Sequence, residues 1–151
     1  MPLVLLGSLA CAQELMVQKV LPLEAALKIA QGAMERCKAD GYKVSVTIVD
    51  AAGMVKVQLR GDGTNPHTVE LGKRKAYTAM TYKRTSAETL KLWSTAGVFP
   101  TIEGTVAVGG GVPIRAGADV IGGIGVSGAP GGEKDELCAE EGIKKVASIL
   151  K

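Results

Sequence analysis

The sequence predicts an α+β domain in which helices pack on an antiparallel sheet of four to five strands. Three observations lead to this prediction. Apolar residues recur with the period of a helix near the beginning, in the middle and at the end of the chain. Between them lie segments in which apolar and polar residues alternate, as in half-buried strands. Short turn sequences separate these strand segments, which favours antiparallel hairpins over parallel crossovers.

The composition is that of one compact domain. The chain has 151 residues, of which 46% are hydrophobic and 22% are charged, and its net charge is +3. This argues against intrinsic disorder, and no apolar run reaches the roughly 18–20 residues of a transmembrane helix. Five aromatic residues offer little surface for base stacking, so we expect no nucleic-acid partner. Three cysteines are too few for a disulfide scaffold and cannot all pair within the chain.

The first twelve residues have the character of an export signal. They are largely apolar and end in Ala10-Cys11-Ala12, a small-x-small triplet of the kind that precedes a signal cleavage site. We interpret residues 1–12 as the remnant of a secretory signal segment and residues 13–151 as a single domain that is periplasmic or secreted. The alternative is an apolar arm that packs on the domain or on a partner subunit, in a protein that is otherwise cytoplasmic.

A helix and a β-hairpin are predicted for the first third of the domain. Apolar residues spaced by three and four positions predict an amphipathic helix from Leu23 to Cys37. Alternation over residues 44–48 and 55–59, with turn residues between them, predicts the hairpin. Cys37 and Cys138 both lie in helical patterns, where we expect them to be small buried hydrophobes.

Two helices are predicted next. Asn65 as a capping residue and Pro66 at the first helical position predict a helix that ends near Tyr82. A capping box that begins at Thr85 predicts a second, shorter helix through Trp93.

Glycine dominates the next part of the chain, with eleven glycines in the 29 positions from 104 to 132. Strands are predicted at residues 105–108, 112–115 and 119–127. A glycine within a strand indicates that a helix, a ligand or another subunit approaches the backbone closely. The amides of the loop at residues 128–132 could bind a carboxylate or phosphate, or could simply cap the following helix. That last helix is expected over residues 134–150, with four buried residues: Leu137, Ile143, Val146 and Leu150.

The helix predicted after Asn65 has two contrasting faces. One face is mostly small and can approach a neighbouring element closely; it consists of Val69, Gly72, Ala76, Ala79 and Met80. The opposite, polar face consists of His67, Glu70, Arg74, Tyr77, Thr78 and Thr81. It is either a solvated surface with an ordinary ion pair between Glu70 and Arg74, or the lining of a pocket that accepts an anion.

Several motifs together resemble one family. They are residues 49–53, 60–63, 74–79 with Glu70 before them, 109–115 and 122–128. Over residues 20–150 the chain resembles the haem-degrading or haem-binding family that includes the glycolate-operon protein G, a secreted haem-binding sensor accessory protein and the C-terminal domain of a corrinoid adenosyltransferase. The resemblance implies a profilin-like α+β layout and assembly into a homo-oligomer such as a dimer, tetramer or octamer. It also implies that some members bind haem and that some of these are exported.

The first functional hypothesis is therefore haem or related tetrapyrrole binding, with slow haem degradation or redox sensing as associated activities. From the residues alone, His67 would hold the iron, with Tyr77 or a water as the alternative ligand. The cationic residues that would face the haem propionates are Arg60, Arg74, Lys75 and Arg115.

The second hypothesis is a cofactor-independent isomerase, tautomerase or lyase that acts on a small carboxylic or oxo acid. His67 or Glu70 would move a proton, while Arg74, Arg115 and the glycine-rich amides would hold the carboxylate. The single histidine excludes a zinc site built from several histidines. The third hypothesis is a small oligomeric binding module.

Overall fold

The computed structural model describes residues 14–99 and 102–151. The signal segment expected at residues 1–12 lies outside the described residues. The described elements follow the chain in this order: α1 (Leu23–Ala39), β1 (Ser45–Asp50), β2 (Val55–Arg60), α2 (His67–Tyr82), α3 (Ser86–Ala96), β3 (Gly111–Ala116), β4 (Asp119–Ser127) and α4 (Gly132–Lys144).

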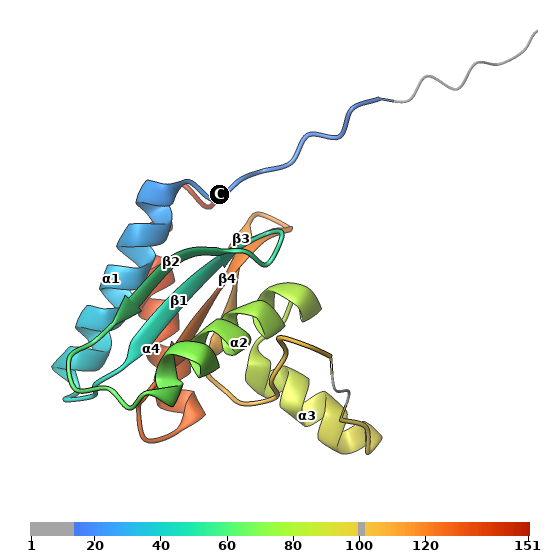
Figure 1. Ribbon diagram of the computed structural model, residues 1–151. Coiled ribbons are helices and arrows are strands. Elements are labelled where there is room, and N and C mark those ends of the chain that lie inside the picture. The colour runs from blue at the N-terminus through green and yellow to red at the C-terminus, as the bar shows by residue number, and fades with distance from the viewer. Residues whose placement is uncertain (1–13, 100–101) are drawn as a thin grey trace, which may run out of the picture.

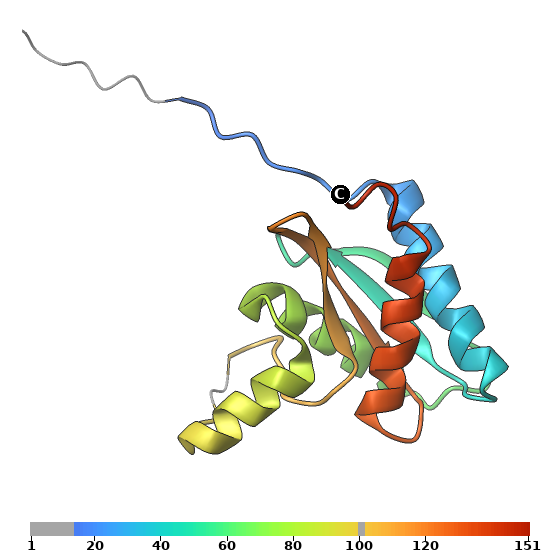
Figure 2. The same ribbon diagram turned by 180° about the vertical axis from the view of Figure 1, so that it is seen from behind.

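The four strands form one antiparallel sheet in the order β2-β1-β4-β3. Helices α1 and α4 lie side by side on one face of the sheet, and α2 crosses the other face with α3 beside it (Figures 1 and 2). The predicted α+β class and the antiparallel sheet are therefore confirmed. The first described residues run away from the body of the domain (Figure 1), and Leu15, Met16 and Val17 among them are almost fully exposed. Closer to α1 the chain joins the domain: Lys19 donates to the carbonyl of Ala116, and Leu21 is fully buried.

The burial of each strand follows from its place in the sheet. Strand β1 is central and has a helix on each face, so even its polar residues Ser45 and Thr47 are fully buried. Strand β2 lies at an edge and is only partly buried. The turn between them is fixed by Asp50, whose carboxylate accepts hydrogen bonds from the amides of Ala52 and Met54 at 2.9 and 3.1 Å.

Helix α2 lies directly on the backbone of β4 because both contribute glycine at the crossing. A Cβ at Gly125 of β4 would overlap the carbonyl oxygen of Gly72 in α2, and a Cβ at Gly123 would overlap the carbonyl oxygen of Ala76. The strand glycines therefore indicate the approach of a helix, which is one of the three readings that the sequence left open.

Three predicted elements differ from the structure. Residues 105–108 form no strand, because their backbone groups bond to side chains of the helices: the amide of Val106 donates to Thr78, and the carbonyl of Val108 accepts from Ser86. Helix α3 continues three residues past Trp93, to Ala96. Helix α4 ends at Lys144, and turns follow it.

Two side chains also differ from their predicted roles. Leu137 is 53% exposed, because the buried face of α4 consists of the small or polar residues Asp135, Cys138, Ala139 and Gly142. No side-chain hydrogen bond caps α2, and the residue that precedes its first turn is Pro66. Asn65 contributes its backbone carbonyl instead, which accepts from the amide of Thr68 at 3.1 Å.

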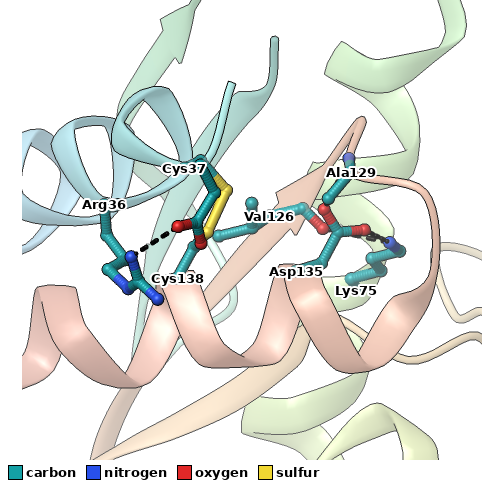
Figure 3. Close-up of a disulfide and its surroundings, with 8 residues drawn as sticks. Arg36, Cys37, Lys75, Val126, Ala129, Asp135 and Cys138 are labelled. Carbon is teal, nitrogen blue, oxygen red and sulfur yellow. Dashed lines mark hydrogen bonds and ion pairs between the residues drawn. A yellow bond between two sulfur atoms is a disulfide. The ribbon is translucent and has the colours of Figure 1, made fainter. Parts of the chain in front are cut away.

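A disulfide joins the two helices on one face of the sheet. Cys37 near the end of α1 and Cys138 in α4 are buried, as predicted, but they are bonded to each other (Figure 3). The pairing leaves Cys11 as the third cysteine. Because the bridge closes a loop across 101 sequence positions, it removes much of the conformational freedom of the unfolded chain.

We expect the double variant Cys37→Ala/Cys138→Ala to have a free energy of unfolding about 2–5 kcal/mol below that of the wild type. Urea unfolding followed by circular dichroism measures the difference. A reductant should lower the stability of the wild type and leave that of the double variant unchanged. Equal stability of the wild type with and without reductant would contradict a stabilising bridge.

Candidate functional site

The first turn of α2 is anchored to the end of the sheet and carries the imidazole of His67. The hydroxyls of Thr68 and Ser45 are hydrogen-bonded at 2.8 Å, and both residues are buried. This contact fixes His67 at the rim of an open hollow of about 330 Å³. Its other lining residues include Leu71, Val108, Ser127 and Gly132. His67 is exposed, and within the described residues its ring takes part in no hydrogen bond or ion pair.

The hollow combines apolar side chains with backbone donors. Leu71 and Val108 supply the apolar surface, and the loop that precedes α4 supplies the backbone. The amide of Gly132 belongs to the first turn of α4 and donates no hydrogen bond within the described chain. Such an amide at the beginning of a helix suits a carboxylate. Within residues 128–132, the amides of Ala129 and Gly131 are already bonded inside the protein, to Asp135 and to the carbonyl of Ala129, so part of this loop has the capping role that was the alternative to anion binding.

The wall of the hollow contains a buried ion pair (Figure 3). The ammonium of Lys75 lies 2.7 Å from the Asp135 carboxylate and donates a second hydrogen bond to the carbonyl of Val126 at 3.0 Å. Asp135 also accepts from the amide of Ala129 at 3.0 Å. Both side chains are at most 3% exposed. Burial raises the pKa of the Asp135 carboxyl above its ordinary value, and the charge of Lys75 opposes this effect.

From the sequence, we expect Lys75 to face a haem propionate. Its ammonium instead points into the protein and is already paired. The sequence contained the signal for this position. At 100° per residue, Lys75 lies about 40° beyond Ala79, at the edge of the small face of α2, which packs on the sheet. Asp135 was missed because nothing in its local sequence distinguishes it from the solvated carboxylates beside it.

The side chains on the polar face of α2 lie in several different environments. Glu70 and Arg74 form an exposed ion pair at 2.9 Å, and Arg74 also lines a second hollow of about 510 Å³ with Trp93. Tyr77 is half-buried between Gly53 and Gly104. Thr78 is fully buried, and its hydroxyl accepts from the amide of Val106. The polar face thus borders two open hollows and no enclosed cavity in the described chain.

The other two predicted site residues lie at opposite ends of the sheet. Arg60 ends β2 and is in register with Ser45 and Ser127, so it lies at the same end as His67. It lines a separate hollow with Tyr42 and Met34. Arg115 lies near the β3–β4 turn, and its guanidinium donates to the carbonyl of Lys83. A single chain therefore does not bring Arg60, Arg74 and Arg115 to one hollow.

Two further features, a metal-binding cluster and a membrane-spanning helix, are absent from the described residues. No group of three or more histidine, cysteine, aspartate or glutamate side chains is arranged to hold a metal ion there. None of the helices in the described ranges is both long enough and apolar enough to cross a membrane.

Replacing Lys75 tests the ion pair. We expect Lys75→Met to lower the free energy of unfolding by about 3–5 kcal/mol, because the buried Asp135 carboxylate loses its partner. In Lys75→Met/Asp135→Leu, where no charge is left unpaired, the loss should be smaller. Lys73→Met on the same helix is the matched control and should change stability by no more than about 0.5 kcal/mol, since Lys73 is exposed. An equal loss at both lysines would contradict the buried pair.

The raised pKa of Asp135 predicts a pH effect. A carboxyl whose pKa is higher in the folded state contributes stability that is complete below its ordinary pKa of 3.8 and is lost as the pH rises through the folded-state value. We therefore expect the wild type to lose stability relative to Asp135→Asn as the pH is raised from about 4. Urea unfolding over a pH series measures this difference. Burial also raises the pKa of Glu136, but that residue is common to both proteins. A difference that is constant with pH would contradict the prediction.

Comparison with known proteins identifies relatives of the whole fold. A crystal structure of HbpS superposes with a TM-score of 0.85 at 40% identity, covering 89% of this chain and 95% of that one. A double mutant of Streptomyces reticuli HbpS gives a TM-score of 0.85 at 37% identity, with 97% of each chain covered. The PduOC:Heme complex gives a TM-score of 0.77 at 27% identity, covering 85% of this chain and 96% of that one. No curated protein matches.

The family model described as haem degrading protein HbpS-like matches residues 21–144, which include every helix and strand of the described fold. The chain therefore belongs to the HbpS-like family of haem-degrading proteins.

Proposed function

We propose that this protein binds haem and that His67 is the iron ligand. The observation that carries the proposal is the free imidazole of His67 at the rim of a hollow, in a chain of a haem-degrading family. A relative in complex with haem, at 27% identity, supports the same function. A neutral imidazole is a common axial ligand of haem iron.

The chemistry of the hollow fits a haem in two further respects. Leu71 and Val108 offer apolar contacts for a macrocycle, and Val108 is 41% exposed, so its side chain is accessible. The free amide of Gly132 is a donor for a propionate carboxylate. When bound, haem would supply the iron centre for the haem-degrading activity, which we infer from the family description alone.

The size of the hollow supports a site completed by assembly. About 330 Å³ is near the lower limit of ligand pockets, which span roughly 300–1,000 Å³. One chain would therefore cover only part of a macrocycle. Arg74 and Arg115 line other hollows, so only a second copy could bring them to the same haem. We accordingly propose a homo-oligomer in which a neighbouring copy covers the haem and supplies propionate partners.

The disulfide supports export. Bridges such as Cys37–Cys138 form and persist in oxidising compartments and are rare in the cytosol. We therefore infer a periplasmic or secreted protein, which is the location that the signal-like residues 1–12 also favour.

A hemin titration tests the function and the ligand separately. We expect a saturable Soret shift with the wild type and, for His67→Ala, an affinity lower by at least about tenfold because the axial bond is lost. Tyr77→Phe, which removes the alternative iron ligand, should titrate like the wild type. Absence of saturable binding would contradict haem binding and would direct attention to small oxo acids as substrates. Unchanged binding by His67→Ala would leave the function standing and exclude His67 as the ligand.

A further inference from the structure

A second hollow at the same end of the sheet has a different chemistry from that of His67. It has a volume of about 550 Å³ and lies between the end of α1, the beginning of β1 and the end of β2. Met34 and Tyr42, both partly exposed, contribute its apolar surface, and Val44 lies behind them, only 2% exposed. Lys38, Lys43 and Arg60 surround this surface with three cationic side chains. Its volume lies well within the range of about 300–1,000 Å³ for small-molecule sites.

The walls of this hollow are tied together by the fold. The amide of Tyr42 donates to the carbonyl of Cys37 at 2.9 Å, and Cys37 is itself fixed to α4 by the disulfide. On the other side, the amide of Gly61 donates to the carbonyl of Val44 at 3.0 Å. A Cβ at position 61 would lie 2.7 Å from that carbonyl oxygen and 3.1 Å from the methyl group of Met34. Glycine therefore lets the end of β2 close against the apolar surface, and the hollow is preformed.

The cations that line this hollow, Lys38, Lys43 and Arg60, form no ion pair within the described part of the chain. Of the two carboxylates in the lining, Glu35 lies 3.9 Å from the ammonium of Lys145, and Asp62 is exposed. A fourth cation, Lys134, lies 5.5 Å from the centre of the Tyr42 ring. The lining therefore carries three cations against two carboxylates, and its balance of charge is positive.

We propose that this hollow, defined by Met34, Tyr42 and Arg60, binds a small organic anion that has an apolar ring system and one carboxylate or sulfonate group. The apolar surface favours the ring system, and the unpaired cations favour the acid group. An inorganic anion would leave the apolar surface unused, and a neutral hydrophobe would leave the cations unused. The site goes beyond the proposed haem function and does not depend on it, because it contains neither His67 nor Gly132.

Fluorescence titration of the full chain with 8-anilinonaphthalene-1-sulfonate tests the site. We expect saturable binding of one probe per chain. Arg60→Ala should weaken it about tenfold, the effect of losing one charge-assisted hydrogen bond. Tyr42→Ala should also weaken it, through the apolar surface. Lys91→Ala, which removes an exposed cation on α3, and His67→Ala should bind like the wild type. Far-ultraviolet circular dichroism checks that each variant is folded; since Arg60 is exposed, its variant remains informative if Tyr42→Ala unfolds.

Two further measurements fix the ligand class and the independence of the site. The neutral analogue N-phenyl-1-naphthylamine should bind more weakly than the sulfonate and be insensitive to Arg60→Ala. Hemin should not displace the sulfonate from the wild type.

Four results would overturn the proposal. They are the absence of saturable probe binding, equal affinities of Arg60→Ala and Lys91→Ala, competitive displacement by hemin, and a light-scattering mass that falls in Arg60→Glu. Displacement by hemin would make the hollow part of a haem site, and the fall in mass would show that a second copy covers it. Failure of haem to bind at all leaves the probe result unaffected, so the two proposals fail separately.

Discussion

The contact between the backbones of α2 and β4 sets the position of every group in the candidate site. Gly125 and Gly72 lack the Cβ atoms that would hold the helix away from the strand, so α2 lies directly on the sheet. At this separation the side chain of Lys75 reaches the carbonyl of Val126 and the carboxylate of Asp135. The same contact places Thr68 against Ser45 and thereby fixes His67 at the end of the sheet. A larger residue at either glycine would move the helix and all of these groups together.

Two buried links then connect α4 to the rest of the domain. The Lys75–Asp135 pair ties its first turn to α2 through the sheet, and the Cys37–Cys138 bridge ties its middle to α1 (Figure 3). Because Asp135 also accepts from the amide of Ala129, the loop before α4 is held in place. That loop forms one side of the hollow beside His67. The ion pair is therefore best understood as a positioning element, whose charges are used within the protein and are not available to a ligand.

The sequence predicts the fold well because the fold depends on local patterns. The two strands of the hairpin, the capping box at Thr85 and the helical spacing after Leu23 are all present in the structure. The alternation predicted a half-buried strand at β1, however, and β1 is buried on both faces because helices cover the sheet on each side. The predicted secondary structure is wrong where side chains of other elements bond to the backbone groups of a segment, in place of a neighbouring strand. The segment at residues 105–108 has strand-forming residues, but Thr78 and Ser86 take up its backbone groups.

The site was harder to predict from the sequence for the same physical reason. Helical projection grouped His67, Arg74 and Tyr77 on one face, yet a helix of 16 residues spans the sheet and meets a different neighbour at each turn. The pairing of Lys75 with a residue 60 positions later, and of Cys37 with one 101 positions later, depends on tertiary contacts that no local pattern contains.

Both hollows that we propose as binding sites lie at one end of the sheet, and the geometry of the strands explains why. Arg60, Ser45 and Ser127 form one row across β2, β1 and β4, at the ends where these strands meet loops. Loop residues there are free to turn side chains and amides outward, whereas the middle of the sheet is covered by helices on both faces. Gly128 brings its loop against the backbone of Lys43 and Val44, so the two hollows are neighbours across this contact. One hollow at this end of the sheet contains the imidazole of His67 and the free amide of Gly132, and the other contains the cationic apolar surface around Tyr42. A single rigid end of the sheet therefore presents two sites of different chemistry.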